Sequence, residues 1–149
     1  MKPAFDIRVV PWSEAIAQAR AVRERVFIEE QQVPRDLEWD EWDEASQHAV
    51  ALDEQGRGIG TARLLPDGRL GRMAVLGEWR RHGVGTALAR ALIERARQQG
   101  LQRILLHAQT HAAPFYRRLG FTEQGPIFQE AGIPHVEMTA DLPAEDAEP

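Results

Sequence analysis

The sequence predicts a single α/β or α+β domain built on a mixed β-sheet. Its 149 residues suit one domain, since natural domains are most often about 100–150 residues long. Strand-like and helix-like patterns follow one another as strand, one or two helices, three strands, helix, strand, helix and two strands. The acidic tail 143–149 lacks such a pattern and is expected to be disordered, which leaves 1–142 as the domain.

The first third of the chain predicts a strand, a helix and a polar segment. Apolar and polar residues alternate over 5–10, as in a strand. Ser13 is expected to cap the following helix and Pro34 to end it. One apolar stripe recurs at helical spacing between them: Ile16, Ala19, Val22, Val26 and Phe27. Residues 35–46 are polar and predict a loop or a short helix.

The middle of the chain predicts an antiparallel meander. Strands are expected over 49–52, 59–65 and 70–76. The segments that join them, Glu54-Gln-Gly-Arg-Gly58 and Pro66-Asp-Gly68, have the residues that tight turns require.

Two helices and three strands are expected in the last third. One helix starts at Gly83 and ends at Gly100, a residue type that favours helix C-termini. A short helix over 112–119 ends at Gly120 and tolerates Pro114 only in its first turn. Strands are expected over 104–106, 121–129 and 134–142. The first of them is apolar throughout, which is typical of a strand buried on both faces.

Composition excludes several classes of chemistry. The chain has no cysteine, which rules out disulfides, thiolate nucleophiles, zinc–thiolate sites and iron–sulfur clusters. Its one lysine, Lys2, is terminal, whereas a P-loop needs a lysine after its second glycine. Neither serine, Ser13 or Ser46, lies in the Gly-x-Ser-x-Gly turn of serine hydrolases.

Charge and hydropathy predict a soluble protein with neither nucleic acid nor membrane as a partner. The net charge is −5 and the pI about 5.5, which gives no electrostatic footprint for nucleic acid. No apolar run approaches the ~20 residues of a membrane span, and the first residues do not resemble a signal peptide. We therefore expect a cytoplasmic location.

The segment Arg80-Arg-His-Gly-Val-Gly-Thr-Ala-Leu88 places glycines where a strand turns into a helix. Glycine lets the backbone approach a ligand, and a helix N-terminus favours an anion. Arg80 and Arg81 add positive charge beside this turn. Three interpretations are open: a plain strand-to-helix turn, a diphosphate site, or a Rossmann dinucleotide fingerprint, which the glycine spacing and Leu88 disfavour.

Tyr116 is the only tyrosine and falls on the short helix after a buried strand. One interpretation is a packed aromatic ring with its hydroxyl at the surface. The other is a phenol that donates a proton, because its ordinary pKa near ~10 suits protonation of a departing thiolate.

Two segments together resemble the GNAT superfamily of acyl-CoA-dependent N-acyltransferases. Residues 80–88 resemble motif A of that family, and Phe115-Tyr-Arg-Arg-Leu-Gly-Phe121 resembles motif B, in the right order along the chain. Residues 22–34 and Gly132-Ile-Pro-His-Val-Glu-Met138 resemble the ElaA-like branch. The resemblance covers roughly 5–142.

The resemblance implies a mostly antiparallel mixed sheet with helices on both faces, whose parallel central strands, 70–76 and 104–108, splay apart. Acetyl-CoA would lie in that cleft as cosubstrate. Its pantetheine would pair with Met73, Ala74 and Val75, and a backbone N–H near Val75 would stabilise the thioester oxyanion. Other residues implied to bind acetyl-CoA are Arg80, Arg81, His82, Gly83, Val84, Gly85, Thr86, Gln109 and Phe115.

The resemblance also implies direct acetyl transfer to an amine, with Tyr116 protonating the leaving thiolate and no covalent enzyme intermediate. The sequence departs from common family patterns twice. Gln109 stands nearest to where many relatives have asparagine, and Arg72 is the only charged side chain along the central part of the strand where some relatives place a glutamate base. A water-relayed proton and an amine that arrives neutral are both open. The candidate bases are His135, Glu130, Glu38 and His107.

Residues 36–44 hold six carboxylates, with Trp39 and Trp42 among them. One interpretation is a solvated loop. The other is an electronegative mouth that attracts a cationic amine, with the tryptophans holding the cation or instead covering the edge of the core. The residues expected to contact the acceptor are Glu38, Trp39, Glu130 and His135.

No metal site is expected, because His107 and His111 have i, i+4 spacing but fall on a strand and in a loop.

Together, these patterns predict a GNAT-type N-acetyltransferase that uses acetyl-CoA on a small-molecule or peptide amine. The alternative is a GNAT-fold protein that binds acyl-CoA without transferring it, as a sensor or partner module. The apolar run 126–138 also allows a homodimer through the last strands.

Overall fold

The computed structural model describes residues 4–33 and 40–142. Its helices and strands follow the predicted order within a few residues. They are β1 Asp6–Pro11, α1 Trp12–Arg23, the π-helix η1 Glu24–Glu30, α3 Trp42–Ala45, β2 Gln47–Leu52, β3 Gly58–Leu64, β4 Leu70–Val75, the 3₁₀ turn η2 Gly77–Trp79, α4 Val84–Gln98, β5 Arg103–Gln109, the 3₁₀ turn η3 Thr110–Ala112, α5 Ala113–Arg118, β6 Thr122–Glu130 and β7 Ile133–Asp141. Pro34, Glu38, Trp39 and the tail 143–149 lie outside the described residues.

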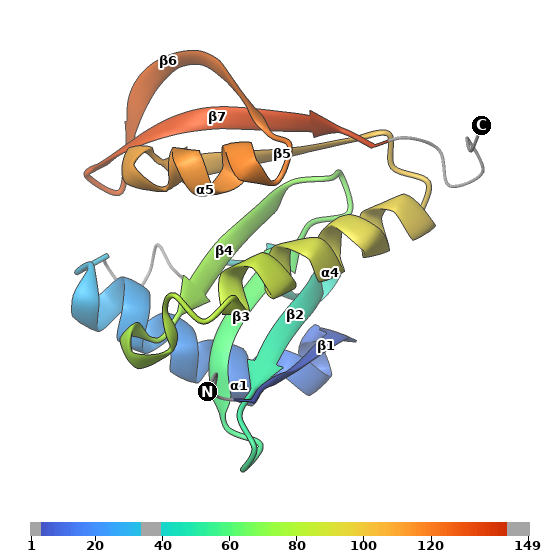
Figure 1. Ribbon diagram of the computed structural model, residues 1–149, viewed down its shortest axis with the longest axis vertical. Coiled ribbons are helices and arrows are strands. Elements are labelled where there is room, and N and C mark those ends of the chain that lie inside the picture. The colour runs from blue at the N-terminus through green and yellow to red at the C-terminus, as the bar shows by residue number, and fades with distance from the viewer. Residues whose placement is uncertain (1–3, 34–39, 143–149) are drawn as a thin grey trace.

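The strands form two sheets, with the orders β1-β2-β3-β4 and β5-β7-β6 (Figure 1). Every pairing inside each sheet is antiparallel, so the expected meander is confirmed. Among the described residues, the parallel contact between the sheets is one bridge, Arg69 with Leu105. The predicted α+β domain with a mostly antiparallel arrangement is therefore confirmed, and its parallel part is short.

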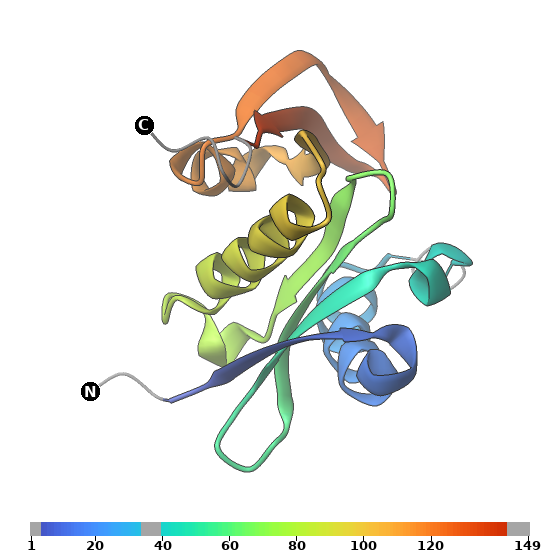
Figure 2. The same cartoon turned by 90° about the vertical axis from the view of Figure 1, so that its right-hand side faces the viewer.

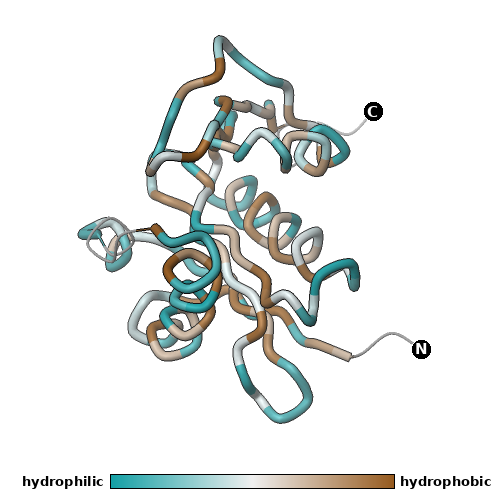
Figure 3. The backbone as a smooth tube through the Cα atoms, turned by 90° about the vertical axis from the view of Figure 1, so that its left-hand side faces the viewer, coloured by the Kyte–Doolittle hydropathy of each residue, from teal (hydrophilic) through white to brown (hydrophobic). Residues whose placement is uncertain are grey.

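Helices α1 and α4 cover opposite faces of the first sheet, and both pack on β3 (Figure 2). Gly60 lets α4 approach β3 closely, because a Cβ there would lie 2.9 Å from Val84 Cγ1 and 3.0 Å from Leu88 Cδ1. The apolar strands between the two helices carry the core, whereas the turn between β2 and β3 is hydrophilic (Figure 3). None of the described helices is long and apolar enough to cross a membrane.

Strands β4 and β5 begin side by side and then diverge. Leu105 N–H donates to Gly68 O at 3.0 Å, next to the parallel bridge. Beyond that point the described residues provide no strand between the facing edges of β4 and β5, and their ribbons run apart (Figure 1). The splayed pair that the family resemblance implies is therefore present, with backbone groups of β4 left on an open edge.

Two expectations about the first helix are corrected by the structure. Ser13 does not cap α1, because the helix already begins at Trp12 with Pro11 as its N-cap and has no side-chain cap among the described residues. The helical pattern also changes at Glu24 into the π-helix η1. A π-helix widens the turn of the backbone, and seven residues are too few for this change of period to be visible in the sequence.

Strand β5 is buried on one face, not on both. Ile104, Leu106 and Ala108 are buried, whereas Leu105 is only partly buried and His107 is exposed. The expectation failed because the three apolar residues 104–106 were too short a run to show the alternation. The second face carries polar residues toward the end of the strand.

Candidate functional site

The N-terminus of α4 has the properties of an anion site. Arg81 and Gly83 adopt left-handed backbone conformations, with φ of 68° and 84°. Gly83 is the N-cap, and no described side chain caps the helix, so its first N–H groups remain available. A Cβ at Gly83 would meet no described atom within 4 Å. Left-handed residues next to a helix N-terminus direct successive backbone N–H groups into one concave site, which favours an anion.

Arg80 is committed to protein partners in this arrangement. Its Nη1 and Nη2 lie 2.7 and 2.9 Å from the two carboxylate oxygens of Glu30, and its Nε donates to Val75 O at 3.0 Å. The hydrogen bond from Arg80 lowers the pKa of Glu30. Arg80 therefore joins η1 to the end of β4, although both it and the neighbouring Arg81 are exposed.

Val75 presents its backbone to the open edge of β4. Leu76 N–H donates to Ile59 O on β3 at 2.9 Å, and successive residues of a strand direct their backbone groups to opposite edges. Val75 N–H and C=O therefore point away from β3, and those of Ala74, which pairs with Thr61, point toward it. Val75 N–H thus lies on the edge where the sequence analysis places the thioester carbonyl.

A bulge bends β4 just before this edge. Arg72 has a φ of 51°, and the register with β3 shifts between Thr61 and Arg63. A bulge inserts an extra residue into one strand and re-aims the residues beside it. Met73, which follows the bulge, is partly buried and packs against the core.

Tyr116, on helix α5, packs in the hydrophobic core. Only 8% of the residue is exposed, and its ring meets those of Phe115 and Phe121 edge-on, with centroids 4.9 and 5.9 Å away. Burial raises the pKa of Tyr116 to about 12. The phenol therefore keeps its proton throughout the physiological pH range.

The glycine segment 80–88 and the tyrosine segment 115–121 meet at Gly85. A Cβ added there would lie 3.4 Å from Phe115 Cζ and 3.9 Å from Val75 Cγ2. The end of β4, the start of α4 and the helix α5 therefore converge on one point. Thr86 is partly buried in the first turn of α4, and His82 meets Trp79 edge-on at 6.3 Å.

Gln109 closes the far end of β5 against η1. Its Nε2 donates to Gln31 Oε1 at 2.9 Å, and its Oε1 lies 2.7 Å from His111 Nε2. Side chains of a strand alternate between faces, so Gln109 shares a face with His107. This face is the one that η1 approaches. No cluster of three or more described His, Asp or Glu side chains could hold a metal ion.

Three of the four candidate bases come together on that face. His107 Nδ1 lies 2.9 Å from Glu130 Oε1, and His135 Nε2 lies 3.8 Å from Glu130 Oε2. Phe128 stacks on the His135 ring and meets His107 edge-on. Glu137 Oε1 is 3.7 Å from His107 Nε2. The fourth candidate, Glu38, lies outside the described residues.

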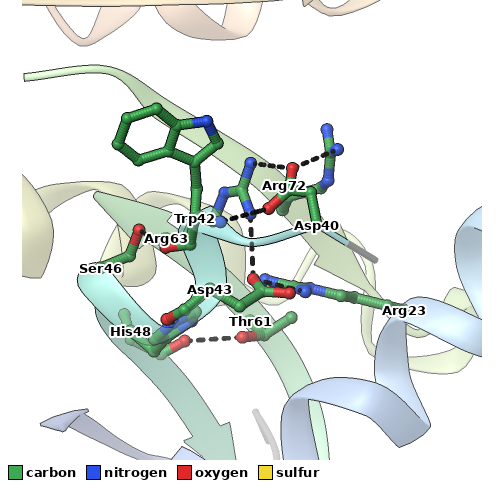
Figure 4. A network of polar contacts seen from close by, with 10 residues as sticks. Arg23, Asp40, Trp42, Asp43, Ser46, His48, Thr61, Arg63 and Arg72 are labelled. Carbon is green, nitrogen blue, oxygen red and sulfur yellow. Dashed lines mark hydrogen bonds and ion pairs between the residues drawn. The ribbon is translucent and has the colours of Figure 1, made fainter. Parts of the chain in front are cut away.

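Two of the four described carboxylates of the acidic segment are engaged by the protein's own arginines, and the other two, Glu41 and Glu44, are exposed. Asp43 is buried, and its Oδ1 lies 2.9 Å from Arg23 Nη1 and 3.0 Å from Arg63 Nη1 (Figure 4). Asp40 lies 2.6 Å from Arg63 and 3.2 Å from Arg72. Burial opposes ionisation of Asp40, but the hydrogen bonds and charge of Arg63 and Arg72 outweigh it and lower its pKa. Both carboxylates therefore neutralise the protein's own arginines.

Trp42 is also engaged by the protein. The Arg69 guanidinium lies 5.6 Å from the centre of its ring, in the range of a cation–π contact. Arg69 therefore covers one face of the ring, while 41% of Trp42 remains exposed. Trp39 lies outside the described residues.

Sequence reasoning missed the partners that organise the site. They are Glu30, Gln31, Phe128, Glu137 and the arginines that bind Asp40 and Asp43. One signal was available for Arg23, which falls on the apolar stripe four residues after Ala19. An arginine on a buried stripe needs a carboxylate partner. The other pairs join segments far apart in the chain and left no local signal.

Comparison with known proteins identifies the family. A family model described as an acetyltransferase (GNAT) domain matches residues 14–142. The chain belongs to the GNAT acetyltransferases. This GNAT domain is 40% identical over 131 residues to the uncharacterized N-acetyltransferase YjcF of Bacillus subtilis, a match that covers 86% of the chain and 94% of the relative.

Solved structures agree with this assignment. A candidate N-acetyltransferase from Lactobacillus plantarum is 31% identical, with a TM-score of 0.85, over 93% of this chain and 99% of that one. Escherichia coli ElaA is 25% identical, with a TM-score of 0.81, over 91% of this chain and 99% of that one. The predicted resemblance to GNAT proteins and to ElaA is confirmed. Family membership supports N-acyltransferase activity, and the Rossmann interpretation of the glycine turn is wrong.

Proposed function

We propose that the protein transfers an acetyl group from acetyl-CoA directly to the primary amine of a small molecule or peptide. The observation that carries the proposal is the convergence at Gly85. There the uncapped start of α4 lies next to the side chains of Val75 on β4 and Phe115 on α5, and the Phe115 ring contacts that of Tyr116. Each part suits a different portion of one elongated thioester.

The residues present fit acetyl-CoA. The backbone N–H groups from Arg81 to Thr86 suit its diphosphate, because they combine left-handed turns with a helix N-terminus. The open edge of β4 suits the pantetheine amides, which can bind a strand as another strand would. Gln109 and Phe115 border the same region. When bound, acetyl-CoA supplies an activated acyl group.

The chain's own residues then have distinct tasks. Val75 N–H donates to the thioester oxygen as negative charge develops on it, a contribution that is worth roughly 3–4 kcal/mol in other enzymes. The Tyr116 hydroxyl donates its proton to the leaving sulfur. No nucleophilic side chain is required, which agrees with the absence of cysteine.

Calorimetry with acetyl-CoA, followed by an assay of thiol release with polyamines, amino sugars and peptide amines, tests this function. We expect micromolar binding and release of thiol with at least one class of acceptor. Acetyl-pantetheine is the matched control. It lacks the diphosphate and should bind far more weakly if the α4 turn holds that group. Absence of acetyl-CoA binding would contradict the proposal.

A non-catalytic sensor of acyl-CoA is the second candidate. It is favoured by one observation: β4 offers no carboxylate base, and its one central charged side chain, Arg72, binds Asp40. Acetyl-CoA binding without thiol release across the whole panel would support the sensor over the enzyme.

A further inference from the structure

Hydrogen-bond acceptors outnumber donors around His135. Its Nδ1 lies 2.7 Å from the carbonyl oxygen of Ile133. A carbonyl can only accept, so Nδ1 carries a proton, and Nε2 is an acceptor whenever the ring is neutral. That Nε2 faces Glu130 Oε2 at 3.8 Å. With the neutral ring, two acceptors therefore face each other at a distance too long for a direct hydrogen bond.

A second carboxylate lies next to the first. His107 Nδ1 donates to Glu130 Oε1 at 2.9 Å, and its other ring nitrogen lies 3.7 Å from Glu137 Oε1. The Glu130 and Glu137 side chains are 44% and 41% exposed, so solutes can reach them, whereas that of His135 is only 8% exposed. His107 by itself cannot neutralise both carboxylates. A ligand that brings N–H donors and positive charge would satisfy the group.

The cluster lies where an acceptor must arrive if the proposed function holds. In the β5–β7 register His107 pairs with Glu137, and Gln109 pairs with His135. His107 and Gln109 lie in the half of β5 that has diverged from β4. Gln31, which follows η1, contacts this face through Gln109. Gln31 follows Glu30, which binds Arg80, and Arg80 binds the carbonyl oxygen of Val75 at the end of β4.

We propose that Glu130 and Glu137 bind the acceptor as a primary ammonium ion and that His135 Nε2 takes its proton. This inference rests on the proposed function and specifies its acceptor. The substrate class is a cationic amine with no carboxylate next to the amino group. The carboxylate of an α-amino acid would lie against Glu130 and Glu137, and like charges side by side oppose binding. Phe128 offers an apolar surface beside the cation.

The proton balance of this step is complete. An N–H bond of the ammonium breaks and its proton passes to His135 Nε2, where Glu130 stabilises the imidazolium. The freed lone pair forms the N–C bond as the C–S bond breaks, and the sulfur takes the proton of Tyr116. The new amide nitrogen returns its surplus proton to the tyrosine oxygen. His135 then releases its proton to solvent.

Kinetics with 2-phenylethylamine as the probe test the inference. Glu130→Gln should raise KM for the amine at least about tenfold and leave acetyl-CoA affinity unchanged. His135→Gln should lower kcat at pH 7 and recover near pH 10, where a larger share of the amine arrives neutral. Glu54→Gln, in the exposed turn after β2, is the matched control and should behave as wild type. Turnover that is unchanged in both site variants would overturn the inference and leave the proposed function standing.

An NMR measurement separates the two proposals. Ring signals of His107 and His135 in the CoA-bound protein should shift with 2-phenylethylamine but not with uncharged 2-phenylethanol. Such shifts without any turnover would support the ammonium site and count against the transferase. If both probes, or neither, move the ring signals, the ammonium site is wrong. Glu130→Asp should retain part of the response and shows that loss in Glu130→Gln is not a folding defect.

Discussion

Arg80 and Glu30 form a two-point ion pair between segments 50 residues apart. The pair ties the π-helix η1 to the turn that follows β4, and the same guanidinium holds the carbonyl oxygen of Val75. One arginine thus fixes the end of the open strand and the helix opposite it. It does so from inside the segment that resembles an anion-binding motif.

This arrangement predicts that the two adjacent arginines contribute unequally to acetyl-CoA binding. Arg81→Ala should weaken affinity roughly tenfold, because a charge-assisted hydrogen bond is worth about 1.5–3 kcal/mol. Arg80→Ala should weaken it less, because Glu30 already holds that side chain. Calorimetric titrations of both variants measure the difference. Equal losses would mean that Glu30 releases Arg80 when the ligand binds.

Tyr116→Phe should separate binding from chemistry. We expect kcat to fall by about 100-fold or more, the usual contribution of a general acid, while acetyl-CoA affinity stays near that of wild type. Because burial raises the pKa of Tyr116 to about 12, ionisation of the phenol should not reduce the wild-type rate below pH 10. Steady-state rates from pH 7 to 10 check both statements. A Phe variant with full turnover would remove Tyr116 from the reaction.

The buried ion pairs around Asp43 should dominate the electrostatic stability of the fold. Asp43→Asn removes the charge of a buried carboxylate that lies 2.9 Å from Arg23, a residue that is 0% exposed, and should lower the free energy of unfolding by about 3–5 kcal/mol. Asp67→Asn is the control, since that side chain pairs with Arg69 while 55% exposed and should cost less than about 1 kcal/mol. Urea denaturation of the two variants gives the comparison. Similar losses would show that the network is not effectively buried.

His48 should make the protein less stable in mild acid. Burial lowers the pKa of His48, and the charge of Arg23 acts in the same direction. Below about pH 6.5 the unfolded chain therefore protonates His48, whereas the folded chain keeps His48 neutral down to a lower pH. Stability is complete above that pH and falls as the pH drops toward the folded-state pKa. Urea midpoints between pH 7.5 and 5.5 should show this slope, His48→Gln should reduce it, and the exposed His111→Gln should not.

Most helices and strands could be predicted because hydrophobic periodicity and turn residues within each segment determine them. The meander from β2 to β4 follows from alternation and from turn residues, and Gly83, Gly100 and Gly120 stand where their helices begin or end. The π-helix escaped prediction because its period differs from that of α1 only slightly over seven residues. The two-residue error in the N-cap of α1, Pro11 instead of Ser13, has a similar local origin.

The site was predictable only in part. Short motifs located Gly85, Phe115 and Val75, which the fold brings together. The partners of Asp40 and Asp43 escaped prediction, because they come from α1, β3 and β4. Charge counted along the chain cannot show which carboxylates a distant arginine neutralises. The same limit hid Glu30 and Gln31, whose partners follow 50 and 78 residues later.

The open edge of β4 also bears on self-association. An unpaired strand edge is a template on which another chain can add a strand and begin to aggregate. Here the bulge at Arg72 breaks the regular spacing of the edge, and the guanidinium of Arg80 covers the carbonyl oxygen of Val75. An intruding strand would find its pairing interrupted after a few residues. The features that shape this edge for a ligand therefore also guard the protein against edge-to-edge polymerisation.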